Sequence, residues 1–250
     1  MNGKVYICAP SSRAVNPYTF NSFTYNIYEL VKAGYDIGEP KSFEEYPLSR
    51  ARNASIEDFY DNSDCDIYFS YDDDTVFKKG DLLRLVESTK EYPIVSGWYL
   101  ARVTGRVPVV FMRSEKKKLL NERDFNYYRP VTLRELLFTL KVDEEHSKVD
   151  AVGLGAVAMT REAVGKLLEV SQSIGKPLFA EWSPIMPSDV HCFGEDLWFG
   201  DFCAVAEMPI HVRTTCFLGH FNGSGYVVGF RHLSSIAMRE GLTEIDFNKA

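Results

Sequence analysis

The sequence predicts a single α/β domain, in which helices cover a β-sheet, and three observations lead to this fold class. The chain has 250 residues, of which 45% are hydrophobic, so it can bury a substantial core and is most economically one domain. It opens with a strand, a polar loop and a helix, which is the first unit of many α/β folds. Short apolar segments then alternate with segments of helical periodicity along most of the chain.

The opening unit is defined by its hydrophobic pattern. Residues 4–9 form a short apolar strand that stops at a polar turn, residues 10–13. The apolar residues that follow fall on one helical face, and Gly34 supplies a C-terminal stop. These apolar residues are Phe23, Ile27, Leu30 and Val31. The unit resembles a nucleotide-binding α/β unit, but it contains neither GxGxxG nor GxxxxGK[ST], so a dinucleotide fold and a P-loop are not supported.

A second helix is expected after a weaker strand at residues 35–37. Ser55 followed by Asp58 resembles a capping box, which predicts a helix start near Ser55. Arg52 and Asn53 then lie at this start, where the helix dipole is already positive. A cation in that position indicates a bound anion such as a diphosphate, although a salt bridge to a nearby glutamate is at least as common.

Three consecutive carboxylates end the most apolar strand of the first half. Residues 67–71 predict a buried strand, and Asp72, Asp73 and Asp74 follow it directly. If the extended geometry continues, Asp72 and Asp74 share one face and Asp73 points the other way. Adjacent acids repel one another, and paired oxygens suit Mg²⁺ or Mn²⁺. The structural alternative is a polar loop of solvated acids before a helix that starts near Asp81.

The middle of the chain alternates between regular and irregular segments. Residues 93–100 predict a strand, and residues 101–148 are interpreted as a variable surface insertion that is partly helical near residues 133–140. Residues 149–159 form an apolar segment rich in small residues, which let a backbone or ligand come close. Thr160 is the expected N-cap of the next helix.

Two polar motifs occur late in the sequence. Gly194 precedes Glu195 and Asp196, which open a helix; an acidic pair also commonly begins a helix because the dipole favours it. His220 follows an apolar strand at residues 216–219. Its structural interpretation is a core histidine whose ring is satisfied by backbone groups, and its functional interpretation is a metal ligand.

Composition excludes several classes of protein. The formal charge of -7 and the pI near 5.3 argue against a broad nucleic-acid footprint. Five cysteines, without CxxC spacing, suggest neither a disulfide framework nor a zinc site. The sequence shows no signal-like N-terminal segment and no apolar run of about 18 residues, so a cytoplasmic chain without a membrane span is expected.

Taken in order, the motifs at residues 72–74, 194–196 and 219–220 resemble those of the GT-A glycosyltransferases, in particular the family 2-like group. Further matches in the same order are residues 9–10, 51–53, 95–99 and 152–155. The resemblance implies a single Rossmann-like domain with a mixed, mostly parallel central sheet flanked by helices. In this domain, residues 1–100 are expected to bind the nucleotide sugar, and residues 149–250 the acceptor.

The resemblance also implies roles for individual residues. Asp72, Asp74 and His220 match the ligands of a Mn²⁺ or Mg²⁺ ion that bridges the diphosphate. Asp196 matches the base that takes the proton of the acceptor hydroxyl, with Glu195 as its neighbour or substitute. The residues expected around the nucleotide sugar are Pro10, Ser11, Arg13, Arg52, Asn53, Asp72, Asp73, Gly97, Trp98 and Gly155.

The predicted activity is metal-dependent transfer of a sugar from a nucleotide-diphosphate sugar, a UDP- or GDP-sugar, to an acceptor hydroxyl with inversion. The alternatives are a retaining transferase, a nucleotidyltransferase and a non-catalytic binder of nucleotide sugars or carbohydrates. Trp98 and Trp182 are either core residues or platforms for a sugar ring. The acceptor is left open, and the acidity of the chain disfavours a nucleic acid.

Overall fold

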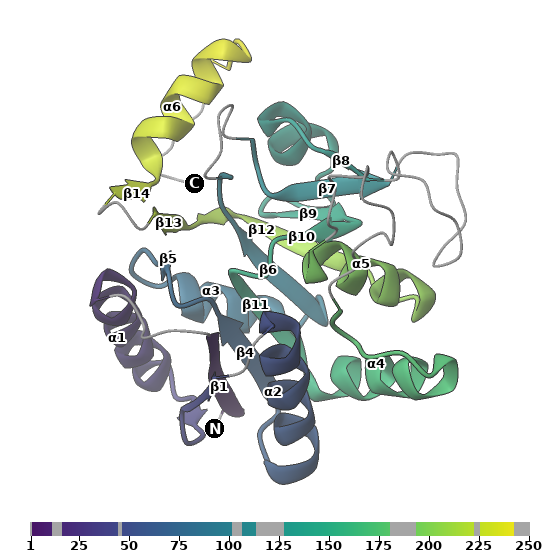
Figure 1. Ribbon diagram of the computed structural model, residues 1–250. Coiled ribbons are helices and arrows are strands. Elements are labelled where there is room, and N and C mark those ends of the chain that lie inside the picture. The colour runs from purple at the N-terminus through teal and green to yellow at the C-terminus, as the bar shows by residue number, and fades with distance from the viewer. Residues whose placement is uncertain are drawn as a thin grey trace.

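The computed structural model describes residues 2–11, 17–44, 47–101, 107–113, 128–180, 194–222 and 226–242. Its centre is an eight-stranded sheet with the order β2-β1-β4-β11-β6-β12-β9, in which β3 also pairs with β1 (Figure 1). The strands are β1 (Lys4–Ser11), β2 (Asp36–Ile37), β3 (Lys41–Glu44), β4 (Ile67–Tyr71), β6 (Ile94–Trp98), β9 (His146–Val149), β11 (Ala156–Thr160) and β12 (Ile210–Phe217). Only β11 and β9 pair antiparallel to their neighbours in this sheet.

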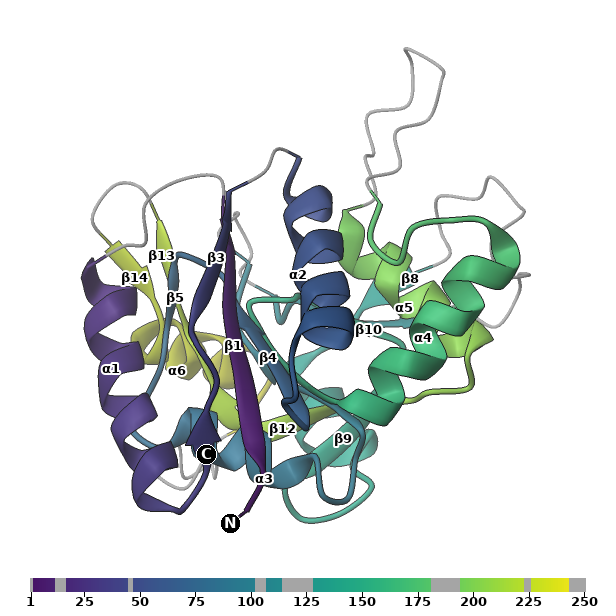
Figure 2. The same cartoon turned by 90° about the horizontal axis from the view of Figure 1, so that it is seen from below.

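Helices cover both faces of the sheet (Figures 1 and 2). One face is covered by α1 (Pro17–Lys32) and α3 (Asp81–Ser88), and the other by α2 (Leu48–Asn62), α4 (Arg161–Ile174) and α5 (Glu195–Val205). The mixed, mostly parallel sheet flanked by helices confirms the architecture that the sequence predicted. Of the helices in the described part of the chain, none has both the length and the hydropathy that a membrane crossing requires.

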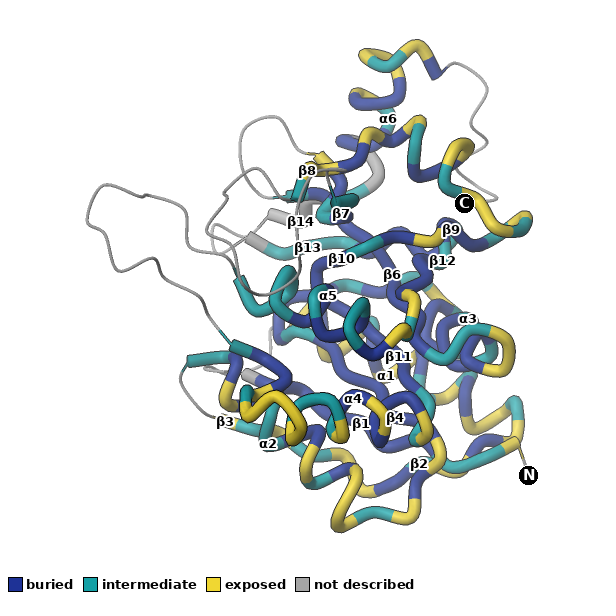
Figure 3. The backbone as a smooth tube through the Cα atoms, turned by 90° about the vertical axis from the view of Figure 1, so that its right-hand side faces the viewer, coloured by how far each residue is buried: buried dark blue, intermediate teal, exposed yellow. Residues whose placement is uncertain are grey.

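The central strands β1, β4, β6 and β11 are buried on both faces, which explains why they are mostly apolar. In β1, Val5 and Ile7 pack with α1 and α3, whereas Tyr6 and Cys8 pack with α2 on the opposite face. All five residues of β4 are buried. Figure 3 shows this pattern as a dark centre with exposed positions on the outer sides of the helices. In the described part of the sheet, the exposed polar side chains lie on its edge strands, such as Lys148 of β9.

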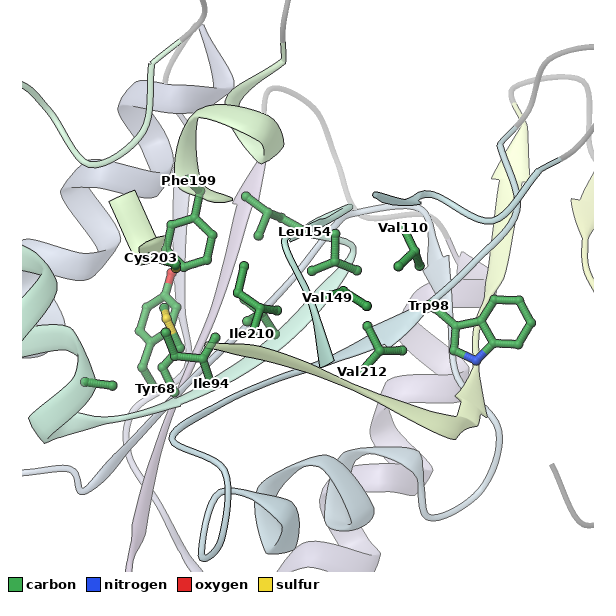
Figure 4. Packing of buried hydrophobic residues seen from close by; sticks show 14 of the residues in the cluster. Tyr68, Ile94, Trp98, Val110, Val149, Leu154, Phe199, Cys203, Ile210 and Val212 are labelled. Atoms are coloured by element: carbon green, nitrogen blue, oxygen red, sulfur yellow. The ribbon is translucent and has the colours of Figure 1, made fainter. Parts of the chain in front are cut away.

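The larger core joins α5 to the central strands. Figure 4 shows Phe199 and Cys203 of α5 next to Tyr68 of β4 and Ile210 of β12. This packing holds α5 against β4 and β12. Two small sheets complete the fold, β10 (Ala151–Val152), β7 (Val110–Arg113) and β8 (Tyr128–Pro130), and β14 (Tyr226–Val228), β13 (Gly219–Asn222) and β5 (Thr75–Val76). The remaining elements are a π-helical turn, η1 (Glu135–Thr139), and α6 (Phe230–Arg239).

Helix α4 confirms the start predicted from the sequence, whereas the predicted start of α2 is wrong. The hydroxyl of Thr160 accepts a hydrogen bond from the amide of Ala163 at 3.2 Å, as expected of an N-cap. Helix α2, however, begins at Leu48 and not near Ser55. Ser55 is buried inside it and donates to the carbonyl of Arg52 at 2.8 Å. The predicted capping box is wrong because Ser55 lies inside the helix and bonds to a backbone carbonyl of the same helix.

Residues 128–148 correct a second interpretation. They are part of the core and not a surface insertion, because β9 pairs with β12 at the edge of the central sheet. Val131, Leu133 and Leu136 are fully buried in the larger core.

Candidate active site

The three aspartates form a turn directly after β4. The amide of Thr75 donates to the carbonyl of Asp72 at 3.1 Å, which closes the turn. The amide of Asp72 donates to the carbonyl of Gly155 at 3.1 Å and ties the turn to the loop before β11. The extended geometry that would place Asp72 and Asp74 on one face therefore does not continue beyond Tyr71. Instead the two carboxylates reach different partners.

Arg52 joins this turn to the start of α5. Its side chain is only 2% exposed, and its Nη2 donates to Asp72 Oδ1 at 2.6 Å. Its Nε donates to Glu195 Oε1 at 3.4 Å. Burial acts to lower the pKa of Arg52, but the charges of Asp72 and Glu195 outweigh it, so the pKa rises. A permanently charged guanidinium thus holds together two motifs that lie more than 120 positions apart in the sequence.

Negative charge is crowded around Arg52. Burial raises the pKa of Asp72; Arg52 opposes this shift, and Asp74 and Glu195 add to it. Burial and the charge of Glu195 raise the pKa of Asp196 to about 7, against the opposing effect of Arg52. Asp196 lies in the first turn of α5, whose dipole favours its ionised form. Asp196 therefore changes its charge near neutral pH, which an ordinary surface aspartate does not do.

Asp74 reaches His220 on the other side of the turn. Asp74 Oδ1 and His220 Nε2 are 3.3 Å apart. The pairing of β13 with β5 sets this distance, because it places His220 opposite Thr75. The amide of Phe221 also donates to the carbonyl of Asp74 at 2.8 Å. The Asp74–His220 pair is thus positioned by backbone hydrogen bonds as well as by its own contact.

Tyr99 is a site residue that the sequence analysis missed. Its ring is buried edge-to-face against His220, with 4.7 Å between the ring centroids. A Cβ on Gly153 would lie 2.2 Å from Tyr99 Oη, and a Cβ on Gly155 would lie 2.6 Å from the ring. The small residues of this loop therefore make room for Tyr99. Tyr99 follows β6 as Asp72 follows β4, and this shared position at strand ends was the available signal.

The spacing of two of the three predicted ligands is compatible with a divalent cation. Adjacent ligands of an octahedral Mg²⁺ ion at about 2.1 Å are separated by roughly 3 Å, close to the 3.3 Å between Asp74 Oδ1 and His220 Nε2. Asp72 is turned toward Arg52 instead. Among the described residues, no three His, Cys, Asp or Glu side chains gather closely enough to hold a metal by themselves. Magnesium typically takes one or two protein ligands and completes its shell with phosphate and water.

Several of the other predicted nucleotide contacts bond to or pack against the protein itself. The side-chain Nδ2 of Asn53 donates to the backbone carbonyl of Phe179 at 2.7 Å, and Asn53 Oδ1 accepts from the backbone amide of Phe179 at 3.0 Å. Trp98 has no exposed surface, and its Nε1 donates to the carbonyl of Thr214 at 2.9 Å. Gly97 is packed against Leu218. In this structure Trp98 is a core residue, and its ring presents no face to a sugar.

The remaining predicted contacts complete this survey. Pro10 and Ser11 end β1, where they pair with Phe43 and Glu44 of β3. Asp73 is buried within the acidic turn. Arg13 lies outside the described residues, as does Trp182. The structure therefore brings together Arg52, Asp72, Asp74, Glu195, Asp196, Gly155 and His220.

No protein-family model matches the sequence, and no curated protein matches it either. Solved structures are similar in fold. A197 from STIV is 15% identical over 90% of this chain and 93% of that chain, with a TM-score of 0.48. GalNAc-T7, solved with UDP, GalNAc and Mn²⁺, is 11% identical over 88% of this chain and 43% of that chain, with a TM-score of 0.48. A Drosophila β1,4-galactosyltransferase 7 mutant, in complex with manganese, UDP-Gal and xylobiose, is 11% identical over 93% of this chain and 79% of that chain, with a TM-score of 0.47. At these identities the similarity concerns the fold alone.

Proposed function

We propose that this chain is a metal-dependent glycosyltransferase of the GT-A type. It moves a sugar from a nucleotide-diphosphate sugar to an acceptor hydroxyl with inversion at the anomeric carbon. One observation carries the proposal: the acidic turn after β4 and the acidic start of α5 meet at a single buried guanidinium, Arg52. Such a cluster provides separate carboxylates for the two tasks that the reaction sets, support of the leaving group and removal of a proton.

Asp74 and His220 are the residues that would hold the cation. Bound there, a Mn²⁺ or Mg²⁺ ion would offset the negative charge that grows on the departing diphosphate. The 3.3 Å between Asp74 Oδ1 and His220 Nε2 supports this assignment. Tyr99 packs on the ring of His220 and limits its rotation. Arg52 contacts Asp72 and Glu195 and so orients both carboxylates.

Asp196 is assigned as the base. A base is most effective when its pKa lies near the working pH, and burial raises the pKa of Asp196 to about 7. Its carboxylate takes the proton of the acceptor hydroxyl as the oxygen attacks the anomeric carbon and the bond to the diphosphate breaks. Attack from the side opposite the leaving group inverts the configuration. A retaining transferase would give the other anomer, and NMR of the anomeric proton of the product distinguishes the two.

A screen of UDP- and GDP-sugars for Mn²⁺-dependent hydrolysis tests the proposal. We expect one donor to be hydrolysed by the wild type, with at least a hundredfold loss in Asp74→Asn. Asp64→Asn is the matched control, because Asp64 is an exposed carboxylate paired with Lys4. Full turnover in excess chelator would contradict the metal assignment. Calorimetric binding of a nucleotide diphosphate without any turnover would favour the non-catalytic binder.

A further inference from the structure

The outer side of α1 carries an unusual number of exposed aromatic rings. Phe20 is 62% exposed and Tyr25 is 71% exposed, values far from those of the rings in the core. The sequence from Pro17 to Tyr28 contains no charged residue. The exposed large side chains of this helix, here called the α1 aromatic face, are Tyr18, Phe20, Tyr25, Tyr28 and Val31. Grouped exposed apolar side chains of this kind mark an interaction site.

The α1 aromatic face begins at the candidate active site. Tyr18, in its first turn, stacks on Phe221 of β13 with 5.7 Å between the ring centroids and 27° between the ring planes. Phe221 follows His220 directly, and its amide donates to the carbonyl of Asp74 at 2.8 Å. Figure 2 shows the start of α1 beside β13 and β5. The face therefore leads away from the Asp74–His220 pair along the helix.

We propose that the α1 aromatic face binds a carbohydrate chain, which is the acceptor of the transfer reaction. This inference rests on the proposed function, because the acceptor role needs a transferase site at the end of the face. The rings supply flat apolar surfaces for the C–H groups of sugars, and the tyrosine hydroxyls supply hydrogen bonds at the edge of each ring. Asn21 adds an exposed amide to the same helix. A neutral, hydroxyl-rich polymer matches this combination of apolar faces and uncharged polar groups.

The spacing along α1 favours a chain over a single sugar. Tyr25 comes seven positions after Tyr18, which corresponds to about 10.5 Å along the helix axis. That separation exceeds one sugar ring, and Tyr28 extends the surface by nearly one further turn. A monosaccharide could contact Tyr18 beside the site, whereas only an oligosaccharide could contact Tyr18 and Tyr25 together.

Charge argues against a membrane as the occupant. Helices that lie on membranes usually carry lysine and arginine on their polar face, whereas Lys32 is the only basic residue of α1. The chain also has a formal charge of -7, which anionic lipids repel. A lipid surface is therefore an outcome that the test must be able to detect, as is a second copy of this chain.

Calorimetric titration of the full chain, without donor or metal, tests the α1 aromatic face by itself. The probes are maltohexaose, cellohexaose, chitohexaose and xylohexaose, each compared with its monosaccharide. We expect at least one hexasaccharide to bind more tightly than its monosaccharide. Tyr25→Ser should weaken that binding about threefold to tenfold, the value of one stacked ring. Phe138→Ser is the control, because Phe138 is also an exposed aromatic residue, 57% exposed against 71% for Tyr25, but lies in η1.

Three results would overturn the inference. The first is that no hexasaccharide binds, or that Tyr25→Ser binds as the wild type does while circular dichroism shows it folded. The second is a dimer in sedimentation velocity that Tyr25→Ser makes monomeric. The third is co-sedimentation with phosphatidylcholine–phosphatidylserine vesicles that Tyr25→Ser abolishes. If a hexasaccharide binds through Tyr25 but no nucleotide sugar is hydrolysed, the carbohydrate face stands and the proposed transferase activity fails.

Discussion

Replacement of Arg52 by methionine tests whether a buried charge holds the site together. The substitution keeps a long side chain but removes the charge that Asp72 and Glu195 contact at 2.6 and 3.4 Å. Removing one partner of a buried ion pair typically costs 3–5 kcal/mol, because the other charge stays buried. We expect Arg52→Met to lower the free energy of unfolding by about 3 kcal/mol, near the lower end of this range, because the contact to Glu195 is long. Urea unfolding at pH 7 measures the difference.

A matched control and a pH series make the Arg52 experiment specific. Arg129→Met removes an exposed pair with Glu135, which should cost less than about 1 kcal/mol. Burial already raises the pKa of Asp72 in the wild type, and without the opposing charge of Arg52 that folded-state pKa should rise further above its unfolded value. The folded state would then bind more protons, so the variant should regain stability as the pH falls from 7 to 5. The reasoning would be refuted if Arg52→Met lost no more unfolding free energy than Arg129→Met and if that loss did not change with pH.

Three further predictions concern single residues. The rate of sugar transfer, as kcat/KM, should rise with pH through about 7 because the ionised Asp196 is the base, and Asp196→Asn should remove that rise. Gly153→Ala should cost about 1–3 kcal/mol in calorimetric unfolding, because its Cβ would lie 2.2 Å from Tyr99 Oη; an unchanged Tm would contradict this packing. Burial lowers the pKa of His211 to about 4, so the unfolded state binds its proton first, and stability should fall by roughly 3 kcal/mol between pH 6.5 and 4. In urea unfolding at a series of pH values, His211→Asn should reduce this loss of stability between pH 6.5 and 4. An equally large loss in the variant would show that His211 does not cause it.

The elements that could be predicted from sequence are those whose pattern is local. Strand β1 and helix α1 followed from a short apolar run and a helical period, and the cap of α4 from a single threonine. The start of α2 could not be predicted, because Ser55 forms its hydrogen bonds inside the core with Arg52 and Tyr68. A capping pattern does not reveal which face of a helix will be buried.

The sequence placed several of the site residues in one hypothesis but did not predict their contacts. The order of the acidic motifs brought Asp72, Asp74 and Asp196 into one hypothesis, whereas the turn after β4 sends Asp72 to Arg52 and Asp74 to His220. These partners depend on how α2 and β13 pack against the sheet, which no local pattern encodes. Tyr99 was missed because an aromatic residue after an apolar strand looks like one more core residue.

The contacts of Arg52 also give a physical reason why the site has its present charge. One guanidinium faces Asp72 and Glu195 and acts on Asp196 as well, so the positive charge is shared among three carboxylates. The sharing is unequal, because Asp72 has the short contact and Glu195 the long one. Asp196 is left with burial and the charge of Glu195 as its dominant influences, and its pKa rises accordingly. Asp196 can therefore exchange a proton near neutral pH because burial and the charge of Glu195 together outweigh the effect of Arg52 on its pKa.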